Sequence, residues 1–398
     1  IANTTGSNNT AVGNFAMYTN TIGGYNTSMG QGALNSNTVG NYNTAFGMQA
    51  LVNSTTGTFS TAVGYQAGYS STSDANTFVG YQTGYTSTGA NNTGMGYRSM
   101  YANTTGINNA AYGYDSLRNN TTGSYNTAVG SLALMSNTTG TKNTAVGYYS
   151  LNSNTTGYYN TAVGVNALKS NTRGYYNTAV GYNALYSSVT TAVNTAVGYY
   201  AMKSLTGGNG NVALGWGSMG SATNTYYSIA LGYYSLLNSS NGSEYNIAIG
   251  YQNLQNNTTG NNNTAVGRSA LQANTIGTSN SAFGYFTLSN NTTGVNNNAF
   301  GLQALASNTT GAFNSAFGYK SLAANTTGNS NLAVGPWAAT NVTTASYSIA
   351  IGQSALRTNQ TNNYNVAVGH YALYAAKANG TVGVGQYALG ATTTGTNN

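Results

Sequence analysis

Four side chains in this sequence belong to the types that carry acid–base catalysis or bind metals: Asp74, Asp115, Glu244 and His370. Glycoside hydrolysis needs two carboxylates a few ångströms apart, and a nucleophilic triad needs a serine or cysteine beside a histidine and an acid. The three acids lie far apart in the sequence, no acid is close to the histidine, and cysteine is absent. Whether these residues meet therefore depends on how the chain folds back on itself.

Tyrosine is the commonest large side chain, with 35 copies, and many of them directly follow a recurring glycine. If they stack, they form an aromatic column that stiffens the molecule. The alternative is an adhesive face, on which tyrosine together with asparagine and threonine contacts glycans or other surfaces. The candidates for surface contact are Tyr148, Tyr182, Tyr199 and Tyr233.

A single phrase recurs along the whole chain, with the consensus N-T-A-V-G-Y-x-A-L-x-S-N-T-T-G-x-Y. Its central glycine, the anchor glycine, occurs in 23 copies from Gly13 to Gly385, and nearly every gap is 17 residues. A fixed short period predicts a solenoid. Helical hairpin repeats need about 33 residues or more, so we predict an all-β fold: a parallel β-solenoid with one coil per repeat and about 23 coils.

Within one repeat, "NTAVGY" predicts a strand because it is rich in β-branched residues, and "xALx" predicts a second, shorter strand. "SNTTG" predicts a turn. Stacked coils place equivalent residues about 4.8 Å apart. The acids fall in different coils, and one chain therefore offers no carboxylate pair. We expect no catalytic residue, no cofactor and no metal site, since calcium-binding solenoids need an aspartate in every coil, and we expect His370 to be a surface substitution.

Two neighbouring positions of the strand differ sharply in size. The residue two before the anchor glycine is nearly always alanine, and the residue just before it is always large and apolar. Alternate strand residues face opposite sides, so we predict alanine inside the thin coil and the large row outside; the reverse assignment is the alternative. A long apolar stripe needs a cover, and the same row of neighbouring chains would supply it in a side-by-side, parallel homo-oligomer. The interface candidates are Val129, Val146, Val163, Val180, Val197, Ile249, Phe283, Phe300 and Phe317.

An asparagine recurs four residues before the anchor glycine. Its amide carries donors and an acceptor, so a column of asparagines can form hydrogen bonds along the stack, whereas a column of lysine or glutamate would repel itself. Stacking on identical neighbours thus explains why the repeated phrase is nearly uncharged. The predicted ladder residues are Asn126, Asn143, Asn160, Asn177 and Asn194.

The composition excludes several classes of protein. Charged residues make up 3% of the chain, against about 25% in typical globular proteins, yet 40% are hydrophobic, which argues against disorder. The net charge of +7 comes from ten scattered cations and forms no basic patch, so nucleic acid is not an expected partner. No apolar run approaches the roughly 18 residues of a membrane span, and no membrane insertion is expected within this segment.

Residues 1–398 are expected to form one repeat array, an excerpt of a longer fibre protein, because both ends lie inside the repeat. Three stretches break the pattern, near 65–96, 187–244 and 335–348. They are candidate bends or contact points, or simple drift of the repeat.

The phrases "YSIALGYYSL" (227–236), "YNIAIGYQNL" (245–254) and "YSIAIGQSAL" (347–356) resemble the head repeats of trimeric autotransporter adhesins. The "NTAVG…ALxxNTTG" variant looks more like long repeats in surface fibres of Bacteroidota and in some phage tail fibres. The resemblance covers nearly the whole chain through its A-[VIL]-G core, although the period here is longer. It implies a left-handed parallel β-roll shared by parallel chains, with a trimer favoured.

The expected function is that of a structural, non-enzymatic fibre or adhesin shaft, secreted to the outside of a bacterium and used for attachment to other cells or surfaces. The expected partners are further copies of the chain and, through the tyrosine face, glycans or a target-cell surface. A phage tail-fibre shaft is the alternative, and a glycan-processing solenoid enzyme is a more remote one.

Overall fold

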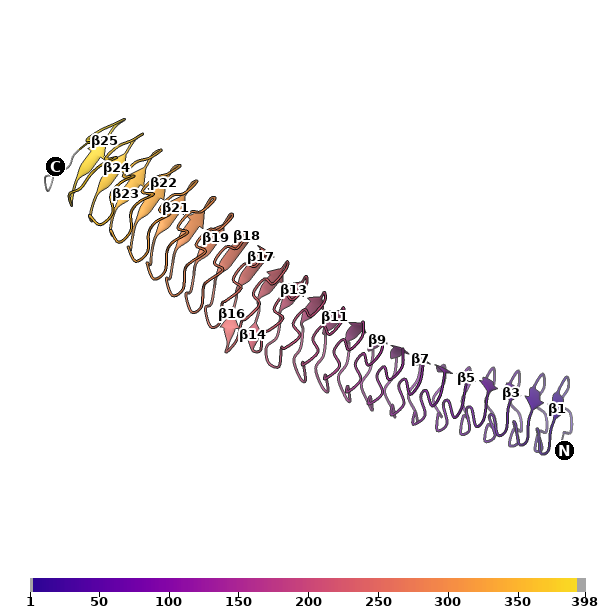
Figure 1. The fold of residues 1–398 in the computed structure, drawn as a ribbon. Coiled ribbons are helices and arrows are strands. Elements are labelled where there is room, and N and C mark those ends of the chain that lie inside the picture. Colours follow the sequence, from indigo (N-terminus) through magenta and orange to yellow (C-terminus); the bar gives the residue numbers. More distant parts are fainter. Residues whose placement is uncertain (1–2, 392–398) are drawn as a thin grey trace. The chain divides into compact units, whose positions relative to one another are not determined.

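The structure, a computed structural model, describes residues 3–391. Over this part of the chain it contains 25 short strands and no helix, and successive coils are offset by 17 residues at most steps. This confirms the predicted all-β parallel β-solenoid. The chain divides into two compact units, one ending at Val197 and the other beginning at Gly198. Within each unit, successive strands lie side by side in chain order (Figure 1).

The first unit holds one strand per coil. These strands are β1 (Thr10–Val12), β2 (Thr27–Met29), β3 (Thr44–Phe46), β4 (Thr61–Val63), β5 (Thr77–Val79), β6 (Thr93–Met95), β7 (Ala110–Tyr112), β8 (Thr127–Val129), β9 (Thr144–Val146), β10 (Thr161–Val163), β11 (Thr178–Val180) and β12 (Thr195–Val197).

The second unit continues the pattern and adds two short strands, β14 (Thr225–Tyr226) and β16 (Ser243–Glu244), which pair with each other. Its other strands are β13 (Val212–Leu214), β15 (Ile229–Leu231), β17 (Ile247–Tyr251), β18 (Thr264–Arg268), β19 (Ser281–Phe283), β20 (Asn298–Phe300), β21 (Ser315–Phe317), β22 (Leu332–Val334), β23 (Ile349–Ile351), β24 (Val366–Val368) and β25 (Val382–Val384).

The strands pair in parallel and in perfect repeat register. Thr161 of β10 lies opposite Thr178 of β11, and Val163 lies opposite Val180. Each side chain therefore stacks on its own copy in the next coil, which is the arrangement that favours small, β-branched and amide side chains over charged ones.

The anchor glycine follows the strand in most coils and forms a corner that no other residue fits. Gly147 has a φ of 129°, a conformation that side chains rarely adopt. A Cβ atom at this position would lie 2.6 Å from the carbonyl oxygen of Gly164 in the next coil. The glycine recurs because two consecutive corners touch backbone to backbone.

The predicted second strand is wrong. Residues after the anchor glycine form a run of turns, in which Tyr149 and Leu151 both have positive φ values, 56° and 47°. Two left-handed residues so close together curl the backbone and prevent it from extending. The N–H of Leu151 still donates to the carbonyl of Ala167 in the next coil, at 3.0 Å, so the turns stack even though they form no strand.

The interior of the coil is narrow and lined by small residues, leucine and asparagine. Ala145 of the strand and Leu151 of the turn are fully buried, while Val146 remains partly exposed. The structure thus confirms that the small row faces inward and the large row outward. Leucine, which curls in from the turn, fills most of the apolar space.

The irregular stretch near 65–96 is a rearrangement of this core. Phe78 replaces the inward alanine and is fully buried, and glycines replace the core leucines of its own coil and the coil before it, Gly84 and Gly68. A Cβ atom on Gly68 would lie 3.0 Å from the Phe78 ring, one on Gly94 would lie 3.2 Å from it, and one on Gly84 would overlap it. One large ring occupies the space of two leucines and an alanine, and strands β4 to β7 keep their pairing.

The other two irregular stretches replace the asparagine of the "SNTTG" turn. In the first, Leu205 and Ala222 occupy its place and are fully buried; near 335–348 it is Val342, also buried. The added strand pair β14 and β16 lies in the first of these stretches. At these three coils a polar interior contact gives way to an apolar one, whereas Ser188 and Ser239 keep a buried polar side chain at the same position.

Candidate functional site

The outward row of the strands forms a continuous apolar stripe along each unit. In the first unit, Val129, Val146, Val163, Val180 and Val197 lie on consecutive strands in direct register. Their exposure is intermediate or just above a third; that of Val129 is 37%. The row bears no charge, and it lies on the same strand face as the threonine two residues earlier.

In the second unit, the same row becomes larger. Ile249 is 37% exposed, and three phenylalanines follow further along. The rings of Phe283 and Phe300 are stacked with centroids 4.7 Å apart, and those of Phe300 and Phe317 are 5.2 Å apart. Large stacked rings on a flat strand face are characteristic of surfaces that pack against another apolar surface.

The strand asparagines form a buried hydrogen-bonded ladder. The side chain of Asn143 donates to the Asn126 side-chain oxygen at 3.2 Å and to the Gly157 carbonyl at 2.8 Å, while its backbone N–H donates to the same Asn126 oxygen. Asn160, Asn177 and Asn194 repeat the pattern. Each amide therefore ties its own coil to the preceding coil and to the turn of the next.

A second asparagine ladder runs through the turn, where the sequence pattern predicted only a turn conformation. Asn137 donates to Asn120 at 2.7 Å, and Asn154 donates to Asn137 at 2.8 Å. Each also donates to the carbonyl of its turn glycine, as Asn154 does to Gly157 at 3.0 Å. The signal available in the sequence was the recurrence of asparagine at this position in most coils.

The second ladder ends where the next coil has no amide. The buried side-chain oxygens of Asn37, Asn171 and Asn325 have no hydrogen-bond partner, and Ser54, Ser188 and Val342 stand at the following step. A buried unpaired acceptor costs about 1–3 kcal/mol, so each break is a local weak point in the stack.

The tyrosine candidates do not form a single cluster. Tyr148 and Tyr182 are exposed in the first unit, with Val165 between them in their column. In the second unit, Tyr199 contacts Trp216 with ring centroids 4.4 Å apart, and Tyr233 stacks on Tyr251 at 5.3 Å. A hydrogen bond with Tyr234 and, after it, burial raise the pKa of Tyr233. Continuous columns occur elsewhere, as at Tyr65, Tyr81, Tyr97 and Tyr114.

Most of the cations lie over an aromatic ring. Arg268 lies over the rings of Tyr251 and Tyr285 at 5.4 and 5.5 Å, and Lys169 lies 4.7 Å from the Tyr149 ring centroid. The others with a ring beneath them are Arg98, Lys142, Lys203, Lys320 and Arg357. A cation can replace one step of an aromatic column because the ring face attracts it.

The acids and the histidine are separate from one another. Asp115 is buried and lies 3.6 Å from Arg118; burial raises the pKa of its carboxyl, and the nearby arginines oppose that rise. Asp74 accepts a hydrogen bond from the backbone N–H of Thr58, Glu244 lies in β16, and His370 contacts the rings of Tyr371 and Tyr387. Residues 3–391 contain no cluster of three or more His, Cys, Asp and Glu side chains that could hold a metal ion.

No protein-family model matches this chain, and no curated protein sequence is similar to it. Within the part of the chain that the structure describes, no helix is both long and apolar enough to cross a bilayer. The surfaces described above are therefore the basis for any functional assignment.

Proposed function

We propose that this chain is the shaft of a structural extracellular fibre that a bacterium uses for attachment, built from parallel chains that associate side by side through the outward strand row. The observation that carries the proposal is that row. In each unit it presents one large apolar side chain per coil, at the same height as its copies in the neighbouring coils and without a charged residue among them.

Such a row suits a second copy of the same chain. Every coil in the partner has the same spacing, so parallel chains in register can meet residue for residue along the row. Monomers rarely leave contiguous apolar patches larger than a few hundred square ångströms in water, and a stripe that gains one large side chain per coil exceeds that size within a few coils. The resemblance described above favours three chains.

The internal ladders support a mechanical role. Two asparagine columns, the threonine hydroxyls that donate to the next coil, as Thr155 does to Thr172 at 3.1 Å, and the backbone ladder all join neighbouring coils. These contacts stiffen the stack and use no side chain of the outward row. We favour a spacer role for the shaft over a role as the adhesive tip.

Association is tested with the double variant Val163→Lys, Val180→Lys, whose two changes lie on adjacent coils of the row. The mass of the wild-type chain and of the variant is measured under native conditions. We expect the wild-type chain to be oligomeric and the variant to be monomeric, because the substitution places charges in an apolar contact. The matched control is Thr139→Lys with Thr156→Lys, which puts the same charges on exposed turn positions and should leave the mass unchanged. A monomeric wild-type chain refutes the proposed packing.

A further inference from the structure

One coil of the second unit lacks two side chains that its neighbours have. Counted from the anchor glycine, the second and fifth residues of this coil are Gly217 and Gly220, whereas the preceding coil has Tyr200 and Lys203 and the following coil has Tyr234 and Leu237. In residues 3–391, this is the one coil with glycine at both positions.

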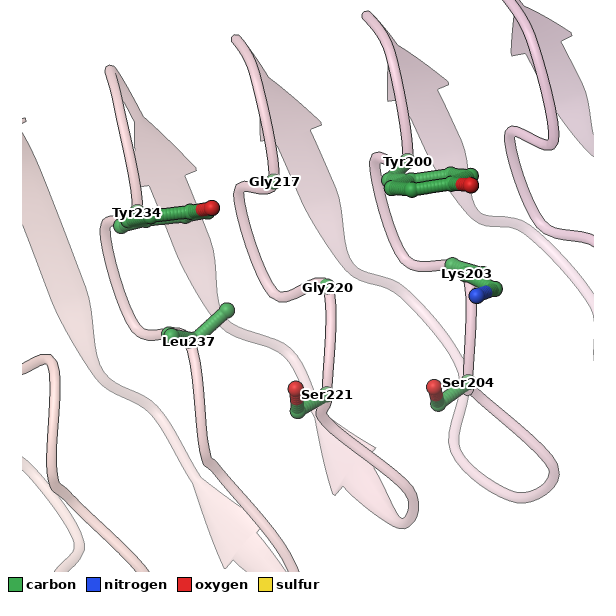
Figure 2. Close-up of a pocket in the computed structure, with 8 residues that line it drawn as sticks. All are labelled: Tyr200, Lys203, Ser204, Gly217, Gly220, Ser221, Tyr234 and Leu237. Atoms are coloured by element: carbon green, nitrogen blue, oxygen red, sulfur yellow. The ribbon is translucent and has the colours of Figure 1, made fainter.

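The missing side chains leave a cavity of about 300 Å³, lined by these six residues together with Ser204 and Ser221. Figure 2 shows the rings of Tyr200 and Tyr234 in one row and the side chains of Lys203 and Leu237 in a second row, with the two glycines between them and the serines in a third row. We call this cavity the glycine slot.

The turn conformation does not require glycine at the first of these positions. Gly217 has a φ of 61°, while Tyr200 and Tyr234 adopt 58° and 51° at the same position of their coils. A side chain on Gly217 would run into the ring of Tyr234. The glycine is therefore not needed for the turn; it makes room for the Tyr234 ring, which reaches over Gly217 and forms a wall of the cavity.

The chemistry of the lining is specific. Two tyrosine rings and Leu237 supply apolar surface, two serine hydroxyls can donate and accept hydrogen bonds, and Lys203 supplies a positive charge, its Nζ 4.4 Å from the Tyr200 ring centroid. Within residues 3–391 the one ion pair is that of Arg118 with Asp115, so no carboxylate neutralises the Lys203 ammonium. Small-ligand sites combine mostly apolar and aromatic walls with a few polar groups in this way.

We propose that the glycine slot binds one acidic sugar unit of a glycan, a pyranose that carries a carboxylate. The C–H face of the sugar packs on the tyrosine rings, its hydroxyls bond to Ser204 and Ser221, and its carboxylate meets Lys203. A cavity of this size holds a single ring. The inference rests on the slot alone and stands whether or not the chains associate into a fibre.

The test compares two probes that differ only in the carboxylate, methyl β-D-glucuronide and methyl β-D-glucoside, by titration of the full chain with NMR detection. We expect the glucuronide to bind roughly fivefold or more tightly, because a charge-assisted hydrogen bond is stronger than a neutral one. Lys203→Met should bring the two affinities together. The matched control is Lys169→Met. Lys169 also lies over a tyrosine ring, that of Tyr149, but the neighbouring coils lack the glycine pair that forms the slot. This variant should change neither affinity.

A second variant fills the slot. Gly220→Leu places in the empty coil the side chain that Leu237 already has at this position, and it should remove binding of both probes while the circular dichroism spectrum and the native mass stay unchanged. Ala306→Leu introduces leucine at the same position of another coil and should have no effect on binding. Unchanged glucuronide binding by Gly220→Leu, equal wild-type affinity for the two sugars, or tighter binding of N-acetyltyrosinamide than of the glucuronide would each overturn the proposal.

Discussion

Phe78 shows how a single residue can be exchanged in a repeat of this kind when its neighbours change with it. Its ring fills the space of core leucines that Gly68 and Gly84 have given up, and Gly94 makes room beside it. The two glycines have φ values of 59° and 60°, close to the 49° of Leu51 at the same position, so leucine can occupy either position without a change of backbone.

Phe78→Ala should destabilise this part of the first unit by about 3–5 kcal/mol, the usual cost of deleting a buried ring. Adding Gly68→Leu and Gly84→Leu to that variant restores the consensus core and should recover most of the loss. Either leucine alone, with Phe78 retained, should destabilise because it overlaps the ring. Hydrogen exchange of the amides in residues 61–96 measures all four variants; a triple variant no more protected than Phe78→Ala would show that the ring and the glycines are not coupled.

Asp115 makes local stability depend on pH in a direction that can be tested. Burial raises the pKa of its carboxyl above the unfolded value, so between these two pKa values the folded coil binds more protons than the unfolded one. Its contribution is complete below the unfolded pKa and is lost as the pH rises through the folded pKa. Protection factors, corrected for intrinsic exchange, should therefore increase in residues 113–130 as the pH falls from 7 towards about 4.

The control for this prediction is Asp115→Asn, which should remove the pH dependence from the same residues. A wild-type coil that loses protection on acidification would mean that the ion pair with Arg118 outweighs the cost of burial, and the predicted direction would then be wrong.

At the scale of the structural elements, the turn ladder decides how firmly one coil holds the next. It stops at Asn325, whose oxygen is buried and unpaired because Val342 follows it. Val342→Asn places an amide of similar volume at that step, where it can donate both to Asn325 and to the carbonyl of Ala345.

We expect Val342→Asn to stabilise the surrounding coils by about 1 kcal/mol, the gain from pairing a buried acceptor. Val342→Thr is the control, because it retains the β-branched shape but lacks an amide that can donate twice. Hydrogen exchange in residues 325–345 provides the measurement. Equal protection in the two variants, or a loss in the asparagine variant, would contradict the role of the ladder in joining coils.

The strand of each coil could be predicted from the sequence, but the run of turns that follows the anchor glycine could not. Alternation of alanine and valine determines which face of a strand is buried, because strand geometry fixes side-chain direction. No comparable rule covers a turn in which Leu151 adopts a left-handed conformation, since leucine normally avoids it and only the stacked coil makes it acceptable. The second strand was predicted wrongly for that reason.

The glycine slot also lay beyond sequence reasoning. Gly217 and Gly220 were visible as departures from the repeat, but a glycine in a turn ordinarily indicates conformation. Only the φ values of Tyr200 and Tyr234, which take the position of Gly217 in the neighbouring coils, show that Gly217 provides room for a ring rather than backbone freedom.

For the molecule as a whole, the low charge predicts how association responds to salt. Charged residues are 3% of the chain, and most of the cations lie over aromatic rings instead of forming ion pairs. Screening acts on charges, so raising sodium chloride from about 0.05 to 0.5 M should change the association constant of the chains by less than about twofold. Analytical ultracentrifugation at the two concentrations measures it, and dissociation by salt would point to contacts made by the cations instead of the apolar row.

The offset of 17 residues between most paired strands also has a consequence for a chain held under tension. A coil raises the stack by about 4.8 Å, yet its residues, once drawn straight, span nearly 60 Å at about 3.4 Å each. Every coil that unfolds under load therefore adds about 50 Å to the length of the chain, and the rest of the stack stays folded. A stack of such coils therefore lengthens in nearly equal steps under tension. It absorbs a sudden pull by unfolding coil by coil before any covalent bond breaks.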